Sequence, residues 1–417
     1  MDLTVRPGRL HGTVSVPPSK SAAHRAIISA ALAGGRSIIS HVDLSSDIRA
    51  TIGACRALGV DMRVDGDTLT VDGRQLCLTG DPIDCAESGS TLRFFIPVAC
   101  TLDGDKTFTG HGRLPMRPLD AYLHIFDNQG ITYTRPPGYN LPLTVSGALR
   151  SGDFRLDGRV SSQFVTGLLF ALPLLNGDSR ISVIGGFESR GYVDLTVDIL
   201  RRFGIEIAVD GDNFAMKGGQ RYTPQNTYVE GDWSQAAFFL VAGAISDGVR
   251  VAGFDGASLQ PDNVIVELLM RMGADISWEG DEFVSSPSQL HGTVIDVSQC
   301  PDLVPPLAIA AAYAEGVTHI TSAARLRIKE SDRLHALAQN LGALGIRAEE
   351  LPDGLIIHGG QPTGGEIDSF GDHRIAMAFS IAAAGASSPV TIRGAECADK
   401  SYPKFYDDYK ALGGEIQ

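Results

Sequence analysis

A short charged stretch near the start of the chain has the composition of an anion-binding helix start. Residues 17–25 read Pro-Pro-Ser-Lys-Ser-Ala-Ala-His-Arg and lead into an apolar run. Ser19 is a good helix N-cap, because its hydroxyl can accept a hydrogen bond from an otherwise unpaired backbone amide. Free N–H groups, the positive helix dipole, Lys20 and Arg25 together predict a phosphate or carboxylate site. Taken alone, the stretch also fits a solvated helix start with ordinary surface cations.

The densest group of charges lies in residues 325–333, Arg-Leu-Arg-Ile-Lys-Glu-Ser-Asp-Arg, between a predicted strand and a predicted helix. Four cations and two carboxylates exceed what a solvated loop needs. A carboxylate held among cations stays ionised at neutral pH, whereas a buried one keeps its proton. Either state suits general acid–base catalysis. An exposed array of salt bridges is the alternative.

Two further acidic positions stand at the heads of apolar runs. Asp302 begins one, and the tripeptide Asp-His-Arg at 372–374 begins another. Each Asp fits a helix N-cap, and a His in such a place is often a cap or a core residue. Asp302 also suits a base that faces the same cleft as Glu330 and Lys20, and Arg374 suits a clamp for an anion.

One arrangement of elements recurs six times along the chain. Apolar helices begin near positions 20, 90, 162, 232, 302 and 372, so successive starts lie 70 to 72 residues apart. A second, amphipathic helix follows in each repeat and ends at a glycine, which fits a left-handed C-cap. These glycines are Gly59, Gly130, Gly204, Gly273, Gly345 and Gly413. The loops before the second helices hold Arg117, Ser189, Tyr192 and Lys400 in three of the repeats.

Strand patterns complete each repeat. A short strand, such as Arg36–Ser40 or Arg180–Ile184, lies between the two helices. A β pair follows most of the glycines, as in 60–64 turning at Asp65-Gly66 into 69–71. Each unit therefore reads strand, helix, strand, helix, strand, strand. The first helix is apolar on nearly all sides and belongs in a core, and about 70 residues cannot bury such a unit alone, so copies must pack together.

The ends of the chain predict how the repeats group. Only four residues follow Gly413, whereas Leu3 to Val16 is surplus strand before the first repeat. The N-terminal strand is therefore expected to close the last half. We predict an α/β protein with two domains of three repeats, 18–229 and 230–417 together with 1–17, and a hinge at the two crossings.

If the two halves face each other, the six helix starts converge on one cleft. Six positive dipole ends with Lys20, Arg25, Arg93 and Arg374 then form a site for a strongly anionic ligand with two charged groups. A purely structural repeat protein with polar helix caps is the alternative.

Composition narrows the class of partner. The 417 residues carry a formal net charge of −14, which argues against nucleic acid and anionic membranes. Six cysteines without a CxxC pair indicate reduced thiols. We find no secretion signal, membrane-spanning run, Walker A motif, HExxH motif or nucleophile elbow. The expectation is a cytoplasmic protein without metal or cofactor.

Together, these motifs resemble the EPSP synthase (3-phosphoshikimate 1-carboxyvinyltransferase) family over residues 12–400. In the first half the resemblance rests on 19–21 with Arg25, 88–93, 116–118 and 161–164. In the second half it rests on 301–302, 327–333, 372–374 and Lys400. Each motif is weak alone, but their order and spacing are specific. The resemblance implies an inverse α/β prism fold, with three βαβαββ-like units in each of two domains that close on substrate.

The resemblance also implies a monomer that transfers the enolpyruvyl group of phosphoenolpyruvate to the 5-hydroxyl of shikimate 3-phosphate and releases phosphate. Phosphoenolpyruvate is expected to bind Lys20, Gly89, Arg117, Gln163, Arg333, Arg374 and Lys400. Shikimate 3-phosphate is expected to bind Ser21, Arg25, Ser161, Ser162, Gln163, Ser189, Asp302 and Lys329. The reaction is an addition followed by an elimination. Our hypothesis is that Asp302 takes the hydroxyl proton and Glu330 handles the carbon proton, with Lys20 assisting.

Two positions depart from the family pattern. Glu87 and Arg325 stand where many members carry asparagine. Glu87 is expected to need a partner, such as an arginine, and Arg325 to contact the shikimate phosphate or to form a salt bridge. The sister enzymes that act on UDP-N-acetylglucosamine usually carry a cysteine in the loop corresponding to 111–117, where this chain has none. That activity and a non-catalytic anion-binding repeat protein are the alternatives.

Overall fold

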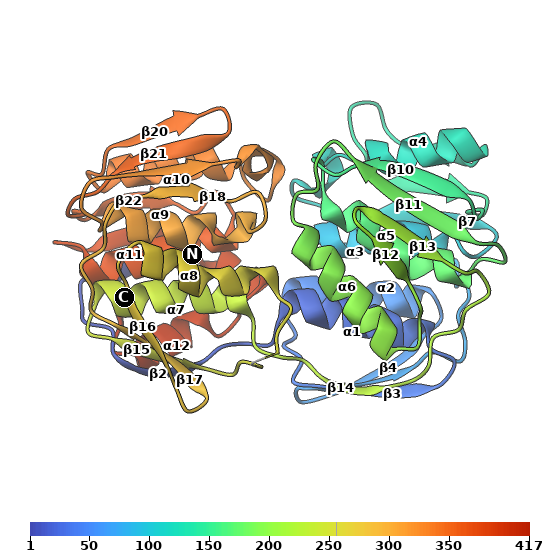
Figure 1. The fold of residues 1–417 in the computed structure, drawn as a ribbon, viewed down its shortest axis with the longest axis horizontal. Helices are drawn as coiled ribbons and strands as arrows, with labels where there is room; N and C mark the ends of the chain where they lie inside the picture. The colour runs from blue at the N-terminus through green and yellow to red at the C-terminus, as the bar shows by residue number, and fades with distance from the viewer. Residues whose placement is uncertain (256) are drawn as a thin grey trace. The chain divides into compact units, whose positions relative to one another are not determined.

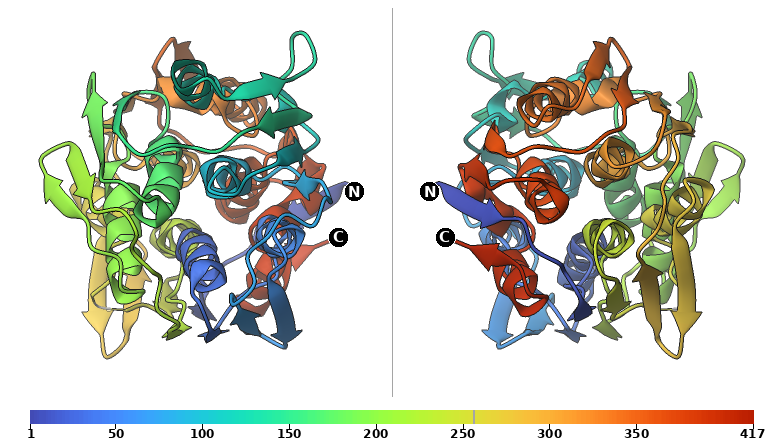
Figure 2. Two further views of the ribbon diagram at one scale, coloured as in Figure 1. Left: turned by 90° about the vertical axis from the view of Figure 1, so that its right-hand side faces the viewer. Right: turned by 90° about the vertical axis from the view of Figure 1, so that its left-hand side faces the viewer.

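The computed structural model describes residues 1–255 and 257–417, which form two compact units. One unit is Pro18–Val229, and the other combines Met1–Pro17 with Glu230–Gln417. Both are built from helices and small sheets (Figure 1). Figure 2 shows several helices of each unit nearly end-on, with strands around them. Each unit has its own apolar core.

The first helix of each repeat is buried along most of its length, as its apolar sequence predicts. These helices are α1 (Lys20–Leu32), α3 (Gly89–Ala99), α5 (Ser162–Ala171), α7 (Trp233–Ile245), α9 (Val304–Ala312) and α11 (His373–Gly385). Five of them begin at a side chain that accepts a hydrogen bond from a backbone amide of the first turn, namely Ser19, Ser88, Ser161, Asp232 and Asp372. The sixth, α9, is preceded by a 3-10 turn at Pro301–Leu303 instead, so Asp302 is not its N-cap. The six predicted helix starts are therefore confirmed to within about two residues, but the N-cap position suggested for Asp302 is wrong.

The second helices end as the glycine pattern predicts. They are α2 (Ser46–Ala57), α4 (Asp120–Gln129), α6 (Arg190–Arg202), α8 (Ile265–Arg271), α10 (Arg333–Ala343) and α12 (Phe405–Ala411). All six predicted glycines have left-handed backbones, with φ between 69° and 97°. Only glycine adopts this conformation without a steric penalty from Cβ, which explains its place at the helix end.

In the described residues the strands form six four-stranded sheets with one topology. The orders are β14-β3-β5-β4, β6-β7-β9-β8 and β10-β11-β13-β12 in the unit Pro18–Val229, and β2-β15-β17-β16, β18-β19-β21-β20 and β22-β23-β1-β24 in the other. In each sheet the first two strands are parallel and the remaining neighbours are antiparallel. The predicted fold of six repeats is confirmed.

The strands have the following bounds in the first unit: β3 Arg36–Ser40, β4 Asp61–Asp65, β5 Thr68–Asp72, β6 Ile83–Asp84, β7 Asp105–Thr109, β8 Thr132–Thr134, β9 Leu143–Ser146, β10 Asp153–Asp157, β11 Ser179–Ile184, β12 Ala208–Asp210, β13 Asn213–Met216 and β14 Asn226–Tyr228. In the second unit they are β1 Leu3–Arg6, β2 Gly12–Ser15, β15 Val249–Ala252, β16 Asp275–Glu279, β17 Glu282–Ser286, β18 Val294–Asp296, β19 Val317–Thr321, β20 Ala348–Leu351, β21 Gly354–His358, β22 Gly365–Asp368, β23 Val390–Arg393 and β24 Glu415–Ile416.

The N-terminal segment supplies two strands to two different sheets. Strand β1 pairs with β23 and β24, so the prediction that it completes the last repeat is confirmed. Strand β2 pairs with β15 and opens the fourth repeat. The sequence between them contains Pro7 and Gly8, which interrupt a strand because proline lacks an N–H donor. The first repeat takes its opening strand, β14, from residues 226–228, where β14 pairs with β3.

The hairpin of the first repeat turns one residue later than the sequence pattern predicts. Asp65 pairs with Thr68, so the two-residue loop is Gly66-Asp67 rather than Asp65-Gly66. Gly66 takes the left-handed backbone that this loop requires, with φ of 61°. Hairpin turn residues thus predict the presence of the loop better than its register.

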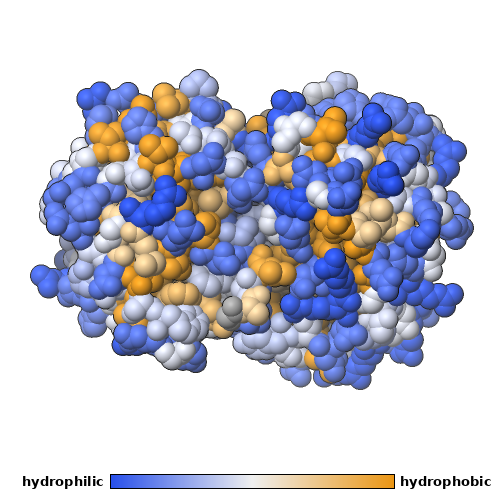
Figure 3. All heavy atoms as spheres, viewed as in Figure 1, coloured by the Kyte–Doolittle hydropathy of each residue, from blue (hydrophilic) through white to orange (hydrophobic). Residues whose placement is uncertain are grey.

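The surface seen in Figure 3 is mostly hydrophilic at its edges, with hydrophobic residues in separate patches between them. Among the residues that the structure describes, no helix is long and apolar enough to cross a bilayer. The same residues contain no group of three His, Cys, Asp or Glu side chains placed to hold a metal ion.

Candidate active site

The start of α1 carries an ion pair that the sequence pattern did not reveal. Lys20 Nζ lies 2.8 Å from Asp47 Oδ2, and both side chains are largely buried. Asp47 lies in the first turn of α2, where an acidic residue is favoured by the helix dipole. Ser19 caps α1 by accepting a hydrogen bond from Ala22 N at 3.3 Å. The predicted cation is thus oriented by a buried carboxylate.

Arg25, one turn further along α1, is held by acceptors of its own unit. Its Nε donates to Thr196 Oγ1 at 2.8 Å, Nη1 to the carbonyl of Ser21 at 2.7 Å and Nη2 to the carbonyl of Tyr192 at 2.9 Å. Burial lowers the pKa of Arg25 to about 10, which still leaves the guanidinium charged at neutral pH. These bonds fix Arg25 between α1 and α6, close to the predicted Ser21 and Tyr192.

The start of α3 fits closely against Arg117. A Cβ at Gly89 would lie 2.7 Å from Arg117 Nη1 and 2.9 Å from its Cζ, so only glycine leaves the guanidinium in place. Arg117 is buried and follows the 3-10 turn Leu114–Met116. The structure therefore brings two predicted phosphoenolpyruvate residues, Gly89 and Arg117, into contact.

The starts of α3 and α5 are joined through an amide side chain. Gln163 Nε2 donates to Ser90 Oγ at 2.9 Å, and Arg93 Nη1 donates to Gln163 Oε1 at 2.7 Å. The hydroxyl of Ser161 caps α5 on the amide of Gln163. Ser189, the N-cap position of α6, is buried with a left-handed backbone at φ of 55°. A left-handed backbone at a non-glycine residue is strained, and such residues often lie at functional sites.

The second unit holds a compact cluster of opposite charges around Arg333. This side chain is 1% exposed and makes four hydrogen bonds to three carboxylates. Nε and Nη2 bind Asp372 at 2.7 and 3.2 Å, Nη1 binds Asp302 at 2.8 Å, and Nη2 binds Glu330 at 3.0 Å. Burial opposes the charge, but Asp372, Glu330 and Asp302 outweigh it and raise the pKa of Arg333. Sequence reasoning predicted Arg333 as a substrate residue but missed that it holds the carboxylates in place.

Asp302 is surrounded by cations. Lys329 Nζ lies 3.3 Å from its Oδ1, and Arg374 Nη2 lies 3.6 Å from its Oδ2. Burial acts to raise the pKa of Asp302, but Lys329, Arg374 and Arg333 together hold it well below its usual range. Burial also lowers the pKa of Lys329 to about 8, against the opposing effect of Asp302. The pair therefore consists of a firmly ionised acid and a lysine that titrates near neutral pH.

The other predicted cations of this unit, Arg374 and Lys400, are also buried. Arg374 is buried in the first turn of α11 and donates to the carbonyl of Asp302 at 3.2 Å. Asp372, besides holding Arg333, accepts a hydrogen bond from Ser331 Oγ at 3.0 Å. Lys400, at the end of the 3-10 segment Ala395–Lys400, is also buried. A buried lysine or arginine requires compensating partners, which makes these cations more than surface charges.

The two residues that depart from the family pattern have different surroundings. Glu87 lies beside His111, whose Nδ1 is 3.4 Å from Glu87 Oε1. Arg325 is half-buried in the 3-10 segment Ala324–Ile328. The pKa of Lys329 is lowered mainly by burial, and the positive charge of Arg325 lowers it slightly further.

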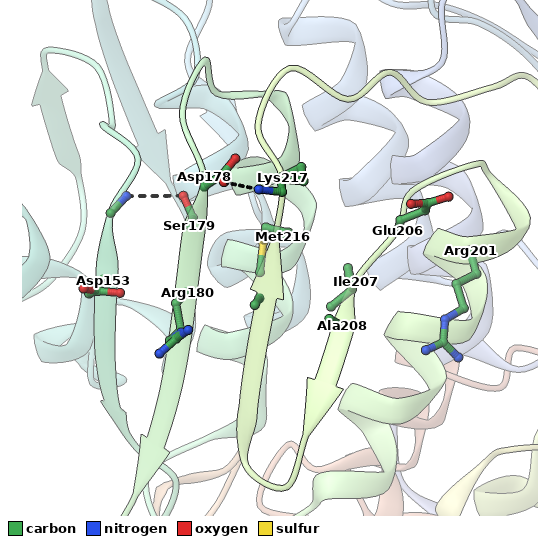
Figure 4. Close-up of a pocket in the computed structure, with 12 residues that line it drawn as sticks. Asp153, Asp178, Ser179, Arg180, Arg201, Glu206, Ile207, Ala208, Met216 and Lys217 are labelled. Atoms are coloured by element: carbon green, nitrogen blue, oxygen red, sulfur yellow. Dashed lines mark hydrogen bonds and ion pairs between the residues drawn. The ribbon is translucent and has the colours of Figure 1, made fainter.

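A separate cavity of about 940 Å³ lies in the first unit, against the sheet β10-β11-β13-β12 (Figure 4). Charged side chains of both signs line it, including Arg180 and Arg201, and Lys217 pairs with Asp178 at 2.7 Å. None of its twelve lining residues is among the predicted substrate or catalytic residues. This cavity is thus distinct from the residues predicted for substrate binding and catalysis.

Comparison with known proteins gives a consistent picture. The family model for EPSP synthase (3-phosphoshikimate 1-carboxyvinyltransferase) matches residues 5–409. Proteins named 3-phosphoshikimate 1-carboxyvinyltransferase from Clostridium kluyveri and Clostridium acetobutylicum are 49% and 48% identical, each over 99% of this chain and over 98% and 97% of their own. The structure of EPSP synthase from Acinetobacter baumannii superposes with a TM-score of 0.84 at 29% identity, covering 100% of this chain and 99% of that one. The enolpyruvyl transferase NikO from Streptomyces tendae, at 19% identity and a TM-score of 0.80 over 100% of this chain and 98% of that one, shares the fold.

Proposed function

The chain belongs to the EPSP synthase (3-phosphoshikimate 1-carboxyvinyltransferase) family, and we propose that its charged helix starts bind and convert the two anionic substrates of that reaction. The enzyme transfers the enolpyruvyl group of phosphoenolpyruvate to the 5-hydroxyl of shikimate 3-phosphate, which yields 5-enolpyruvylshikimate 3-phosphate and phosphate. This step belongs to the shikimate pathway of aromatic amino acid biosynthesis. The family match across residues 5–409 is the observation that carries the assignment.

Phosphoenolpyruvate binding is assigned to residues of both units. They are Lys20, Gly89, Arg117, Gln163, Arg333, Arg374 and Lys400. The contact of Gly89 with Arg117 supports their joint role, because it leaves the guanidinium in a fixed position. Arginine suits this substrate, since its planar fork can bind a carboxylate or a phosphate through two parallel hydrogen bonds.

Shikimate 3-phosphate binding is assigned to a set rich in hydroxyls. Its members are Ser21, Arg25, Ser161, Ser162, Gln163, Ser189, Asp302 and Lys329. Hydroxyl groups at helix starts can donate to a phosphate together with the free backbone amides of the first turn. Asp302 beside Lys329 supplies an acceptor and a donor for ring hydroxyls within 3.3 Å of each other.

For the proton transfers we assign the hydroxyl proton to Asp302 and the carbon proton to Glu330, assisted by Lys20. The low pKa of Asp302 makes it a weak base while Lys329, Arg374 and Arg333 surround it. Bound substrate anions take over part of the interaction with these cations, which raises the basicity of Asp302 when both substrates are present. Fixed charges around the reacting groups then supply electrostatic stabilisation.

Phosphate release from the purified protein tests the function. With phosphoenolpyruvate and shikimate 3-phosphate together, we expect phosphate to form, and we expect none with either substrate alone. Turnover with UDP-N-acetylglucosamine in place of shikimate 3-phosphate would instead support the sister transferase activity. Asp302→Ala and Glu330→Ala are expected to lose most turnover, and full activity in either variant removes that residue from the chemistry.

A further inference from the structure

A chain of buried hydroxyl groups joins the first three helices of the unit Pro18–Val229. His24 Nδ1 lies 2.7 Å from Thr51 Oγ1, and Thr51 Oγ1 lies 2.7 Å from Thr91 Oγ1. Thr91 Oγ1 donates to Ser88 Oγ at 2.8 Å, and Ser88 Oγ also accepts from Thr91 N at 3.2 Å. The four side chains are at most 1% exposed. The chain therefore runs from α1 through α2 to the N-cap of α3.

The direction of the hydrogen bonds follows from the number of protons. A hydroxyl has one proton to donate. Because Thr91 gives its proton to Ser88, it must accept from Thr51, and Thr51 must accept from His24. His24 is therefore the tautomer with a proton on Nδ1. Its Nε2 has no hydrogen-bond partner among the described residues. Burial lowers the pKa of His24 to about 3, which agrees with a neutral ring.

The position of the chain gives it a consequence for the site. His24 and Thr51 each lie one helical turn after Lys20 and Asp47, so the pair at 2.7 Å stands directly behind the ion pair at 2.8 Å on the same two helices. At its other end the chain fixes Ser88, which precedes Gly89 and Ser90. A buried hydrogen-bond network can fix one packing arrangement of the helices that carry it.

We propose that His24, Thr51 and Thr91 are positioning residues for the reaction, which set α1, α2 and α3 so that Lys20 and the Gly89 segment present one fixed surface to phosphoenolpyruvate. This inference rests on the proposed function. It predicts that breaking the hydroxyl chain weakens phosphoenolpyruvate binding more than shikimate 3-phosphate binding. The hydroxyl chain supports the segments that carry Lys20 and Gly89 for phosphoenolpyruvate. Of the shikimate 3-phosphate residues, Ser161, Ser162 and Ser189 lie at the starts of α5 and α6. Ser21 and Arg25 lie on α1, where Arg25 is held independently by Thr196 and Tyr192 of α6.

The test removes single hydroxyls without changing side-chain shape. In Thr51→Val and Thr91→Val we expect the KM for phosphoenolpyruvate to rise about tenfold, because each change removes two hydrogen bonds of the chain. The KM for shikimate 3-phosphate should change less than twofold. Thr51→Ser and Thr91→Ser retain the hydroxyl and should restore the wild-type value. The double valine variant should be no worse than either single one, because a chain broken once no longer transmits the restraint.

Thr318→Val is the matched control. Thr318 lies on β19, is buried to the same degree, and its hydroxyl has no partner among the described residues, so both KM values should stay unchanged. If Thr51→Val lowers the unfolding temperature but leaves the KM for phosphoenolpyruvate at the wild-type value, the chain is merely structural and the proposal is wrong. A wild-type protein that does not turn over shikimate 3-phosphate contradicts the proposed function instead.

A second measurement uses the wild-type protein and needs no substitution. In protein labelled with ¹⁵N-histidine, NMR should show His24 with a proton on Nδ1 and no protonation of its ring between about pH 8 and pH 5. A proton on Nε2, or titration of His24 in this range, overturns the directed chain.

Discussion

At the scale of residues, Asp302 and Lys329 show how one contact sets two acid–base properties. Their oxygen and nitrogen atoms lie 3.3 Å apart in a largely buried place. Burial disfavours both charges. Three cations around Asp302 outweigh burial and lower its pKa. Lys329 is stabilised by Asp302, but burial and the neighbouring cation Arg333 lower its pKa. The acid therefore stays ionised, and the pKa of the lysine falls to about 8. Of the two, Lys329 is the group whose charge changes near physiological pH.

The first prediction concerns the pH dependence of substrate capture. Lys329 is charged below pH 8 and loses its proton as the pH rises through about 8, so its attraction for an anionic substrate is present below that value and lost above it. We expect kcat/KM for shikimate 3-phosphate to fall as the pH rises through about 8. Steady-state kinetics over this range measure it.

Lys329→Arg is the control for this profile, because arginine keeps its charge throughout. The fall near pH 8 should disappear in that variant, even if its overall activity is lower. A wild-type profile that stays flat through pH 8 and above would contradict the prediction.

The second prediction concerns Gly89→Ala. The new Cβ would lie 2.7 Å from Arg117 Nη1, and this atom is the far end of a flexible side chain, so Arg117 should move while the fold is retained. Loss of a charge-assisted contact corresponds to a KM for phosphoenolpyruvate that is higher by about tenfold or more. The KM for shikimate 3-phosphate should change little. Gly53→Ala, in α2 with open space around its Cβ, serves as the control and should leave both values unchanged.

The site residues differ in how far sequence could predict them. Lys20 stands out in the sequence as a cation at a helix start, whereas the substrate roles expected of Arg117, Arg333 and Lys400 come from the family resemblance. Asp47 was missed because an acidic residue in the first turn of a helix is common. The geometry of Arg333 could not be foreseen, since its partners Asp302 and Asp372 lie 31 and 39 residues away in sequence. Only packing of three helix starts brings them together.

At the scale of elements, the repeat itself contains the missing signal. Lys20 and Asp47 are separated by 27 residues, and so are Asp302 and Lys329. In both pairs, one residue lies at the start of the first helix of a repeat and the other lies just before or within the first turn of the second helix. The lysine comes first in the pair Lys20–Asp47, and the aspartate comes first in the pair Asp302–Lys329. Aligning the repeats at this spacing would have pointed to Asp47 from the sequence alone. The helices and their glycine ends were predictable because they depend on local preferences, whereas strand register depends on pairing with distant segments.

The third prediction tests the glycine ends. Gly130 closes α4 with φ of 69° and has open space at its Cβ, so the cost of Gly130→Ala is purely conformational. We expect the free energy of unfolding to fall by about 1–2 kcal/mol. Gly34→Ala is the matched control, because Gly34 also has open space but is not in the left-handed region. Urea unfolding compares the two, and an equal loss in both variants would count against the conformational explanation.

At the scale of the whole molecule, the chain order differs from the order of the repeats. Strands β1 and β2 come from residues 3–15, yet they pair with strands whose sequence lies beyond residue 248. In return, β14 at 226–228 completes the sheet of the first repeat. Because the last repeat is short, the sequence predicted that the N-terminal strand would complete it. The division of the N-terminal segment between two sheets was not predicted, because both sheets have a place for a short strand with the same alternating residues.

The fourth prediction follows from this exchange. Removing residues 1–17 takes the central strand β1 from one sheet and the edge strand β2 from another, so two of the three sheets in the unit that contains Glu230–Gln417 are incomplete. The loss also removes apolar side chains that β1 and β2 contribute to the core of this unit, such as Val5 and Val14. The unit Pro18–Val229 contains neither strand and keeps all its sheets. Hydrogen exchange should therefore become fast across 230–417 and stay slow in the core helices of 18–229. If both units lost protection together, each would depend on the other for its stability, whereas retained protection in 230–417 would mean that β1 and β2 contribute little to it.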